Sequence, residues 1–130
     1  MTNAAAFDGW LERYADAWRS NDAERIGALF SDDAVYRWHP YDEGDDVARG
    51  REAIVSAWLE EPDDPGSWEL ACERLAVDGD LGVARCVTSY ADTGEGTLGA
   101  RVYHNIFLVR LDEEGRCVDF VEYYMRVPAA

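Results

Sequence analysis

The stretch GARVYHNIFLVRLDEEGRCVDFVEYYMR, residues 99–126, decides the fold. Two runs rich in β-branched and aromatic residues, 99–111 and 117–126, flank an acidic turn in which Gly115 can adopt a positive φ. This pattern predicts a long antiparallel hairpin. Both alternating faces of the first run are largely apolar, which is typical of a strand covered on both sides. We therefore expect this strand to lie inside the sheet and not at its edge.

Two polar side chains interrupt the apolar faces of this hairpin. Asn105 lies in phase with Tyr103 and Phe107, and Glu122 lies in phase with Phe120. An amide or a carboxylate on an apolar face costs free energy unless it is paired or lines a cavity that holds water or ligand. The pattern therefore predicts either a buried polar pair or the floor of a cavity.

Helical periodicity is confined to the first sixty residues. Aromatic and aliphatic residues at helical spacing predict an amphipathic helix over residues 5–19. Asp22 is a natural N-cap for a second helix, which we expect to run through Phe30. A third helix is predicted over residues 51–60, immediately after Gly50.

The remaining segments favour strands and loops. We expect a short strand over residues 34–38, followed by a solvated acidic loop over residues 41–49. A second hairpin is predicted from strands over residues 67–77 and 81–91, because Asp-Gly lies between them. We expect residues 92–97 to form a glycine-bearing loop that leads back to the central strand.

The order of these elements indicates an α+β fold in a single domain, residues 1–130. Strands of about a dozen residues are nearly 40 Å long at ~3.3 Å per residue, and such strands twist and curve. We expect three N-terminal helices to pack on one face of a strongly curved antiparallel sheet. Three helices need not fill that concave face completely, so a cavity is expected.

The net charge of −15 limits the partners of this chain. Spread along the sequence, it repels nucleic acid phosphates and anionic membrane surfaces, so neither is expected as a partner. No apolar run approaches 18 residues and no secretion signal is evident, so we expect a cytoplasmic protein.

The three cysteines lead to the same expectation. Cys72, Cys86 and Cys117 are odd in number, show no C-x-x-C spacing and lie in apolar runs. A reduced thiol in such a run behaves as a small hydrophobic side chain. We expect all three to be buried thiols, as is usual in a reducing compartment.

Four segments resemble the nuclear transport factor 2-like superfamily, and most of all its SnoaL-like group of polyketide cyclases. They are residues 13–22, 28–34, 50–54 and 115–124. The resemblance implies a cone-shaped fold with a ligand between the helices and the concave face of the sheet. It also implies a homodimer formed through the outer face of the sheet. The superfamily includes isomerases, dehydratases, cyclases, epoxide hydrolases and non-catalytic binders, so the resemblance specifies the fold better than the function.

Comparison with individual members assigns possible roles by resemblance. Tyr14 falls where steroid isomerases of this fold carry an oxyanion-hole tyrosine, and His39 falls near their aspartate base. Phe107 falls near their second oxyanion donor and cannot donate a proton, which argues against steroid isomerisation by that route. Arg85 and Glu122 resemble two members of the charged set of limonene epoxide hydrolases, whose other carboxylate this chain lacks.

The residues themselves leave two interpretations open at each position. His39 is either a general base or a half-exposed loop histidine, and Tyr14 is either an oxyanion donor or a rim aromatic. Arg85 requires a carboxylate if it is buried, and Glu122 is the candidate, with Asn105 beside it. That pair would be either a structural ion pair or the polar floor of a ligand site. The other residues expected to contact a ligand are Trp18, Trp38, Trp58 and Tyr103.

The sequence indicates no cofactor and no metal. Its two histidines lack the short spacing of a metal site, and it has no glycine-rich phosphate loop or dinucleotide fingerprint. The leading hypothesis is cofactor-independent acid-base chemistry, of the isomerase, cyclase or dehydratase type, on an apolar cyclic small molecule. The alternative is a non-catalytic binder or dimeric interaction module whose cavity is filled by its own tryptophans.

Overall fold

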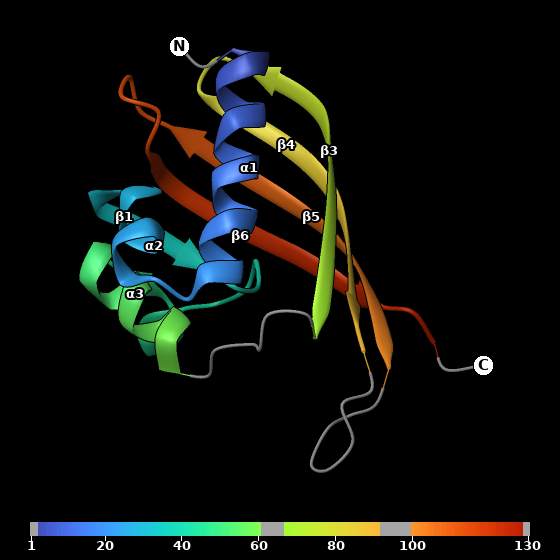
Figure 1. Ribbon diagram of the computed structural model, residues 1–130. Helices are drawn as coiled ribbons and strands as arrows, with labels where there is room; N and C mark the ends of the chain where they lie inside the picture. The colour runs from blue at the N-terminus through green and yellow to red at the C-terminus, as the bar shows by residue number, and fades with distance from the viewer. Residues whose placement is uncertain (1–2, 61–66, 92–99, 129–130) are drawn as a thin grey trace.

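A computed structural model describes residues 3–60, 67–91 and 100–128 as three helices against one face of a curved six-stranded sheet (Figure 1). The loop predicted over residues 92–97 lies outside these described residues. The strand order is β2-β1-β6-β5-β4-β3. The helices are α1 (Ala4–Ser20), α2 (Ala23–Ala28) and α3 (Arg51–Glu60), and a short 3₁₀ helix spans Gly44–Asp46. The strands are β1 (Phe30–Arg37), β2 (Ala48–Arg49), β3 (Trp68–Asp78), β4 (Leu81–Tyr90), β5 (Arg101–Leu111) and β6 (Cys117–Arg126).

The predicted helix starts are confirmed by their caps. The Asn3 side chain accepts a hydrogen bond from the amide of Ala6 at 2.8 Å and begins α1. Asn21 ends α1 in the left-handed conformation, with φ of 51°. Asp22 then caps α2 by accepting from the amide of Glu24 at 2.9 Å, as the sequence predicted. These short-range hydrogen bonds satisfy helix-end amides, which is why they can be read from the sequence.

Both predicted hairpins are present. β3 and β4 pair across the turn at Gly79, and β5 and β6 pair across the turn at Gly115, each glycine with a positive φ. β5 lies between β4 and β6, so its expected position inside the sheet is confirmed. The buried side chains of β5 alternate from Asn105 to Leu111, while His104 faces the other side and is exposed.

The N-terminal part of the sheet differs from the expectation. β1 begins at Phe30, which was expected in the second helix, and β2 lies inside the predicted acidic loop. β1 pairs antiparallel with β2 but parallel with β6, so the sheet is mixed and not wholly antiparallel. The long chain between β1 and β6 allows either direction, and no local turn specifies it.

The core is closed at the end of the sheet that carries the β3–β4 turn. Phe7 and Trp10 of α1 are fully buried there, and the indole of Trp10 donates to the carbonyl of Leu29 at 3.0 Å. Gly82 of β4 lies directly under Phe7, because a Cβ at this position would come within 2.6 Å of the phenyl ring. The close approach of α1 to the sheet therefore depends on the absence of a side chain at Gly82.

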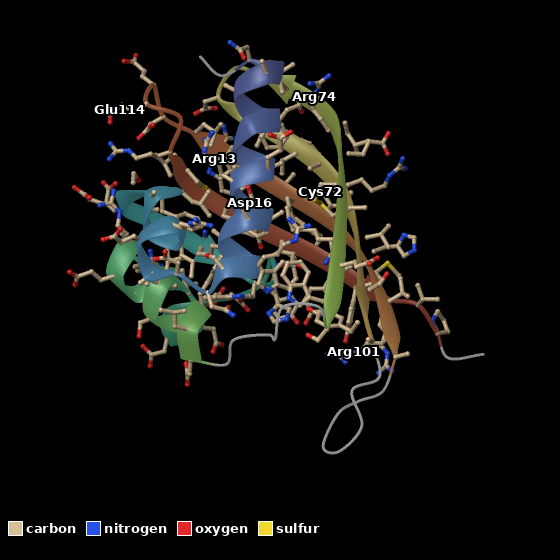
Figure 2. The ribbon with its side chains drawn as sticks, viewed as in Figure 1. Arg13, Asp16, Cys72, Arg74, Arg101 and Glu114 are labelled. Atoms are coloured by element: carbon tan, nitrogen blue, oxygen red, sulfur yellow. A yellow bond between two sulfur atoms is a disulfide. The ribbon has the colours of Figure 1, made fainter. Side chains whose placement is uncertain are left out.

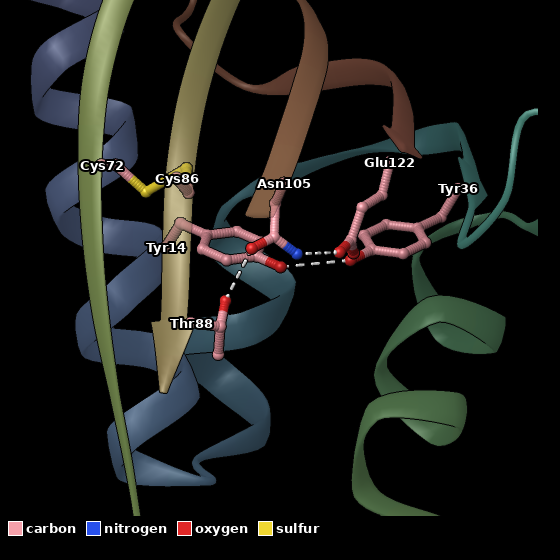
Figure 3. The surroundings of a disulfide bond; sticks show 7 residues. All are labelled: Tyr14, Tyr36, Cys72, Cys86, Thr88, Asn105 and Glu122. Atoms are coloured by element: carbon pink, nitrogen blue, oxygen red, sulfur yellow. Dashed lines mark hydrogen bonds between the residues drawn. A yellow bond between two sulfur atoms is a disulfide. The ribbon is translucent and has the colours of Figure 1, made fainter. Parts of the chain in front are cut away.

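The expectation of three reduced thiols is wrong. Cys72 and Cys86 lie directly opposite each other on β3 and β4 and form a disulfide. Figure 2 labels Cys72 on β3, and Figure 3 labels both cysteines. Their spacing along the chain gave no signal of this pairing, because it follows from the register of the hairpin. Only Cys117 is a buried free thiol, and burial raises the pKa of its side chain. The disulfide removes one of the two reasons for expecting a cytoplasmic protein.

No helix within the described part of the chain is long and apolar enough to cross a membrane.

Candidate functional site

A cavity of about 340 Å³ lies between the helices and the concave face of the sheet, at the end opposite the closed core. It is lined from α1 and α3 on one side and from β1, β4, β5 and β6 on the other. Most of its wall is aromatic, including Tyr14, Trp18, Tyr36, Trp38, Trp58 and Tyr103. Small-molecule sites in proteins usually measure ~300–1,000 Å³, so this volume suits a small ring-containing compound.

The floor of the cavity carries a chain of hydrogen bonds across three strands (Figure 3). The hydroxyl of Thr88 on β4 donates to the Asn105 amide oxygen on β5 at 2.9 Å. The amide nitrogen of Asn105 donates to Oε2 of Glu122 on β6 at 2.7 Å. Thr88 and Asn105 are both buried, so the chain satisfies polar groups that would otherwise be costly inside the protein.

Glu122 is the most perturbed carboxyl group in the described residues. Burial raises its pKa from 4.5 to about 7, against the opposing effects of the Asn105 hydrogen bond and the nearby His39. Desolvation disfavours the charged form of a carboxyl group, and one amide donor only partly compensates. Near neutral pH the side chain is therefore present in both its protonated and its ionised form, which suits a group that donates and accepts protons.

Two phenols face Glu122 across the cavity. The hydroxyls of Tyr14 and Tyr36 lie 3.2 Å apart and share a hydrogen bond (Figure 3). Both rings stack on Phe120. Burial raises the pKa of each phenol above its ordinary value, so both remain protonated. When two hydroxyls share one hydrogen bond, the accepting hydroxyl keeps its own proton for another partner. The pair can therefore donate to an oxygen atom of a ligand.

His39 lies beside the cavity and not on its wall. Its Nδ1 is 3.1 Å from Oδ1 of Asp42, and its Nε2 is 2.8 Å from the hydroxyl of Tyr124. Tyr124 does line the cavity. The histidine predicted as a catalytic base is thus connected to the cavity through a tyrosine.

The expected contact between Arg85 and Glu122 is wrong. Arg85 points to the outer face of β4 and donates to Glu73 on β3 at 2.8 Å, and both side chains are largely exposed. The buried face of β4 carries the other parity, Ala84 and Cys86. Arg85 lies on the same face of β4 as Val83 and Val87, which are only half-buried. Because these neighbours are apolar, the sequence pattern predicted that this outer face belongs to the core.

Of the predicted site residues, all except His39 and Arg85 line the cavity. Sequence reasoning missed Thr88, Tyr36 and Tyr124 as members of the site. Tyr124 could have been found, because it alternates with Glu122 on the same face of β6. Thr88 gave no signal of its own. Arg101 is also on the wall, and its guanidinium lies 4.2 Å from the centre of the Tyr90 ring.

No group of three histidine, cysteine, aspartate or glutamate side chains placed to hold a metal ion occurs in residues 3–60, 67–91 and 100–128.

A curved sheet, three helices on its concave face and a cavity between them define a protein of the nuclear transport factor 2-like class. The chain belongs to the SnoaL-like domain family, whose sequence profile matches residues 11–120. This agrees with the class that the sequence segments resemble. No curated protein matches the sequence.

Solved structures share the fold at low sequence identity. A protein of unknown function from Burkholderia xenovorans, described as NTF-2 like, has a TM-score of 0.70 and 17% identity, covering 97% of this chain and 88% of its own. A similar protein from Mesorhizobium loti has a TM-score of 0.66 and 20% identity, with 96% and 95% covered. A ketosteroid isomerase-like protein from Erwinia carotovora atroseptica has a TM-score of 0.63 and 18% identity, with 95% and 96% covered. At these identities the likeness shows the fold alone.

Proposed function

We propose that this protein is a cofactor-independent acid-base enzyme that moves protons on a small, ring-containing carbonyl compound bound in the cavity. The observation that carries the proposal is Glu122, a carboxyl group with a pKa of about 7 facing an aromatic cavity. The Tyr14 and Tyr36 hydroxyls are assigned to donate a hydrogen bond to the ligand oxygen and so stabilise the partial negative charge that develops on it before Glu122 completes its proton transfer. The name of the ketosteroid isomerase-like neighbour is consistent with chemistry of this class.

The proposed chemistry is the enolisation of a ketone. Protonated Glu122 gives its proton to the carbonyl oxygen as a base removes a proton from the adjacent carbon. The electron pair of the broken C–H bond becomes the new C=C bond, and the former carbonyl oxygen becomes a hydroxyl. Return of a proton at a different carbon completes an isomerisation, and Glu122 regains its proton from the oxygen. Asn105 holds the carboxyl group in place throughout.

The experiment uses β-tetralone, a flat bicyclic ketone, and follows deuterium uptake at its acidic carbon in heavy water by NMR. We expect the protein to accelerate the exchange and Glu122→Gln to lower the rate by about tenfold or more, since general acid-base groups contribute ~10²–10⁴-fold. The rate should fall as pH rises through about 7, because Glu122 loses the proton that it donates. Glu73→Gln, an exposed carboxylate outside the cavity, is the matched control. Equal rates for the wild type and Glu122→Gln would overturn the assignment.

A non-catalytic binder is the second candidate. It is favoured by the mutual satisfaction of the polar groups on the floor, where Glu122 is bound by Asn105 and Tyr14 by Tyr36. If the protein is only a binder, β-tetralone should quench the fluorescence of the cavity tryptophans, but the protein should not accelerate deuterium exchange of β-tetralone.

We also propose a homodimer that forms through the outer face of the sheet. The outer side of β5 carries the half-buried Ile106 and Leu108, and Met125 of the adjacent β6 is 77% exposed. Apolar side chains gathered on one exposed face favour association.

A further inference from the structure

We propose that Tyr124 is the second proton-transfer group of the cavity, and that His39 and Asp42 position it and carry its proton to solvent. This inference rests on the proposed function, because it supplies the base that enolisation requires. The three side chains form one hydrogen-bonded line from the cavity wall outward. Tyr124 would be the catalytic residue of the line, and His39 and Asp42 its positioning residues.

Asp42 fixes the imidazole in place by three contacts. Its Oδ1 lies 3.1 Å from Nδ1 of His39, its Oδ2 accepts from the His39 amide at 3.0 Å, and its own amide donates to the His39 carbonyl at 3.1 Å. The side chain of Asp42 is only 7% exposed. These contacts hold Asp42 in the loop and keep the imidazole ring of His39 from rotating away from Tyr124.

The direction of the hydrogen bonds follows from the donor and acceptor types. An ionised carboxylate only accepts, so the neutral imidazole carries its proton on Nδ1 and has a lone pair on Nε2. The Tyr124 hydroxyl, 2.8 Å away, must then donate to Nε2. Burial, and next the charge of Glu122, raise the pKa of Tyr124, so the phenol remains protonated and has a lone pair for another proton.

The transfer is balanced without a phenolate intermediate. The C–H bond of the ligand breaks and its proton binds to the Tyr124 oxygen, while the original hydroxyl proton moves to Nε2 of His39. His39 becomes an imidazolium ion, and the Asp42 carboxylate compensates its charge. His39 is about one-third exposed, so it returns the extra proton to water. Glu122 supplies the proton that the ligand oxygen gains.

The location of Tyr124 suits a partner of Glu122. The two residues alternate on the same face of β6, so their side chains start about 7 Å apart. That separation would let the two groups contact different atoms of one small ring from the same wall of the cavity. The titratable side chains that act on Tyr124 or contact it come from β5, from β6 and from the loop after β1: Tyr103, Glu122, His39, Tyr41 and Asp42.

The first experiment determines the tautomer of His39 by ¹⁵N NMR and does not depend on turnover. His104→Gln assigns the signals, because the chain has two histidines. We expect the neutral ring of His39 to carry its proton on Nδ1, and Tyr124→Phe to shift the Nε2 resonance. A proton on Nε2 would overturn the inference, since Tyr124 could then not pass its proton to the ring.

The second experiment measures deuterium uptake by β-tetralone across a set of variants. Tyr124→Phe and His39→Gln should each lower the rate by about a hundredfold, the size of a general-base contribution. Asp42→Asn should lower it as well, because an amide no longer holds the correct tautomer. Tyr123→Phe is the matched control, since Tyr123 and Tyr124 are 45% and 44% exposed but only Tyr124 lines the cavity. His104→Gln is the control for His39.

The outcomes separate this inference from the proposed function. Exchange that depends on Glu122 but is unchanged by Tyr124→Phe and His39→Gln would overturn the inference and leave the proposed function standing. Exchange that is unchanged by Glu122→Gln would overturn the proposed function. A merely structural role for Tyr124 predicts a lower melting temperature with an unchanged rate per folded molecule and an unchanged tautomer.

Discussion

Glu122 links the cavity to the stability of the whole protein. Its carboxyl group binds a proton up to about pH 7 in the folded protein and up to about pH 4.5 in the unfolded chain. Between these values the folded state holds more protons, so stability falls as pH rises through this window and is level above it. The difference of about 2.5 pKa units corresponds to ~3 kcal/mol, since each unit is ~1.4 kcal/mol.

Replacing the carboxyl group by an amide should remove that loss. We expect Glu122→Gln to match the wild type at about pH 4, below the unfolded pKa, and to be more stable by up to about 3 kcal/mol at pH 8. Urea unfolding at both values measures the difference. Glu73→Gln, which removes an exposed carboxylate paired with Arg85, should show no such pH dependence. If the Glu122→Gln advantage is the same at both values, Glu122 ionises normally in the folded state.

At the residue scale, the sequence was a good guide to which polar groups are buried but a poorer guide to their hydrogen-bond partners. Asn105 and Glu122 were recognised because each interrupts an apolar alternation, and they prove to be bonded to each other. Arg85 was placed on the wrong face, since valines lie on both sides of it in its own parity. A two-residue period identifies two faces but not which of them is covered.

At the scale of elements, local signals determined the helices and hairpins. Caps and glycine turns act over a few residues, so α1, the start of α2 and both hairpins could be predicted, whereas the end of α2 could not. The parallel pairing of β1 with β6 could not, because it joins segments about 85 residues apart with no turn between them. The disulfide was missed for a different reason: the register of β3 against β4 shifts between Arg74 and Ala76, and only after that shift does Cys72 lie opposite Cys86.

The contact between α1 and β4 makes Gly82 the most sensitive glycine in the closed core. We expect Gly82→Ala to destabilise the protein by about 1–3 kcal/mol, because its methyl group would overlap the buried ring of Phe7. Gly9→Ala is the control. Its methyl group would meet only the mobile end of Arg13 and should stabilise α1 by about 0.5–1 kcal/mol. Thermal unfolding measures the melting temperature of each variant. A shift of both melting temperatures in the same direction would contradict this packing.

The disulfide should hold the edge strand β3 to β4. Its cysteines are separated by 14 positions, and closing a loop of that length contributes about 3 kcal/mol by the chain-entropy argument. Cys72→Ala combined with Cys86→Ala should lower stability by about 2–3 kcal/mol and make unfolding insensitive to reductant. A thiol titration of the unfolded, unreduced wild type should find only Cys117. Finding three thiols would show that the pair is reduced in the protein as purified.

At the scale of the whole molecule, the net charge of −15 opposes the proposed dimer, while the apolar side chains Ile106, Leu108 and Met125 on the outer face favour it. The charges are spread over the surface, so their repulsion is screened as salt shortens the Debye length from ~30 Å at 0.01 M to ~10 Å at 0.1 M. We therefore expect dimerisation to tighten several-fold as salt increases, in contrast to an interface held by ion pairs. Sedimentation equilibrium at the two salt concentrations measures this.

Replacing Ile106 by Glu adds a charge to the apolar outer face and should abolish the dimer without changing deuterium uptake by β-tetralone, since Ile106 does not line the cavity. Glu52→Gln, on the exposed side of α3, changes the net charge far from that face and should alter the association only slightly. A monomer at every salt concentration would exclude association through the sheet. A dimer that survives Ile106→Glu would require a different interface, because a buried unpaired carboxylate costs several kcal/mol at each of its two symmetry-related positions.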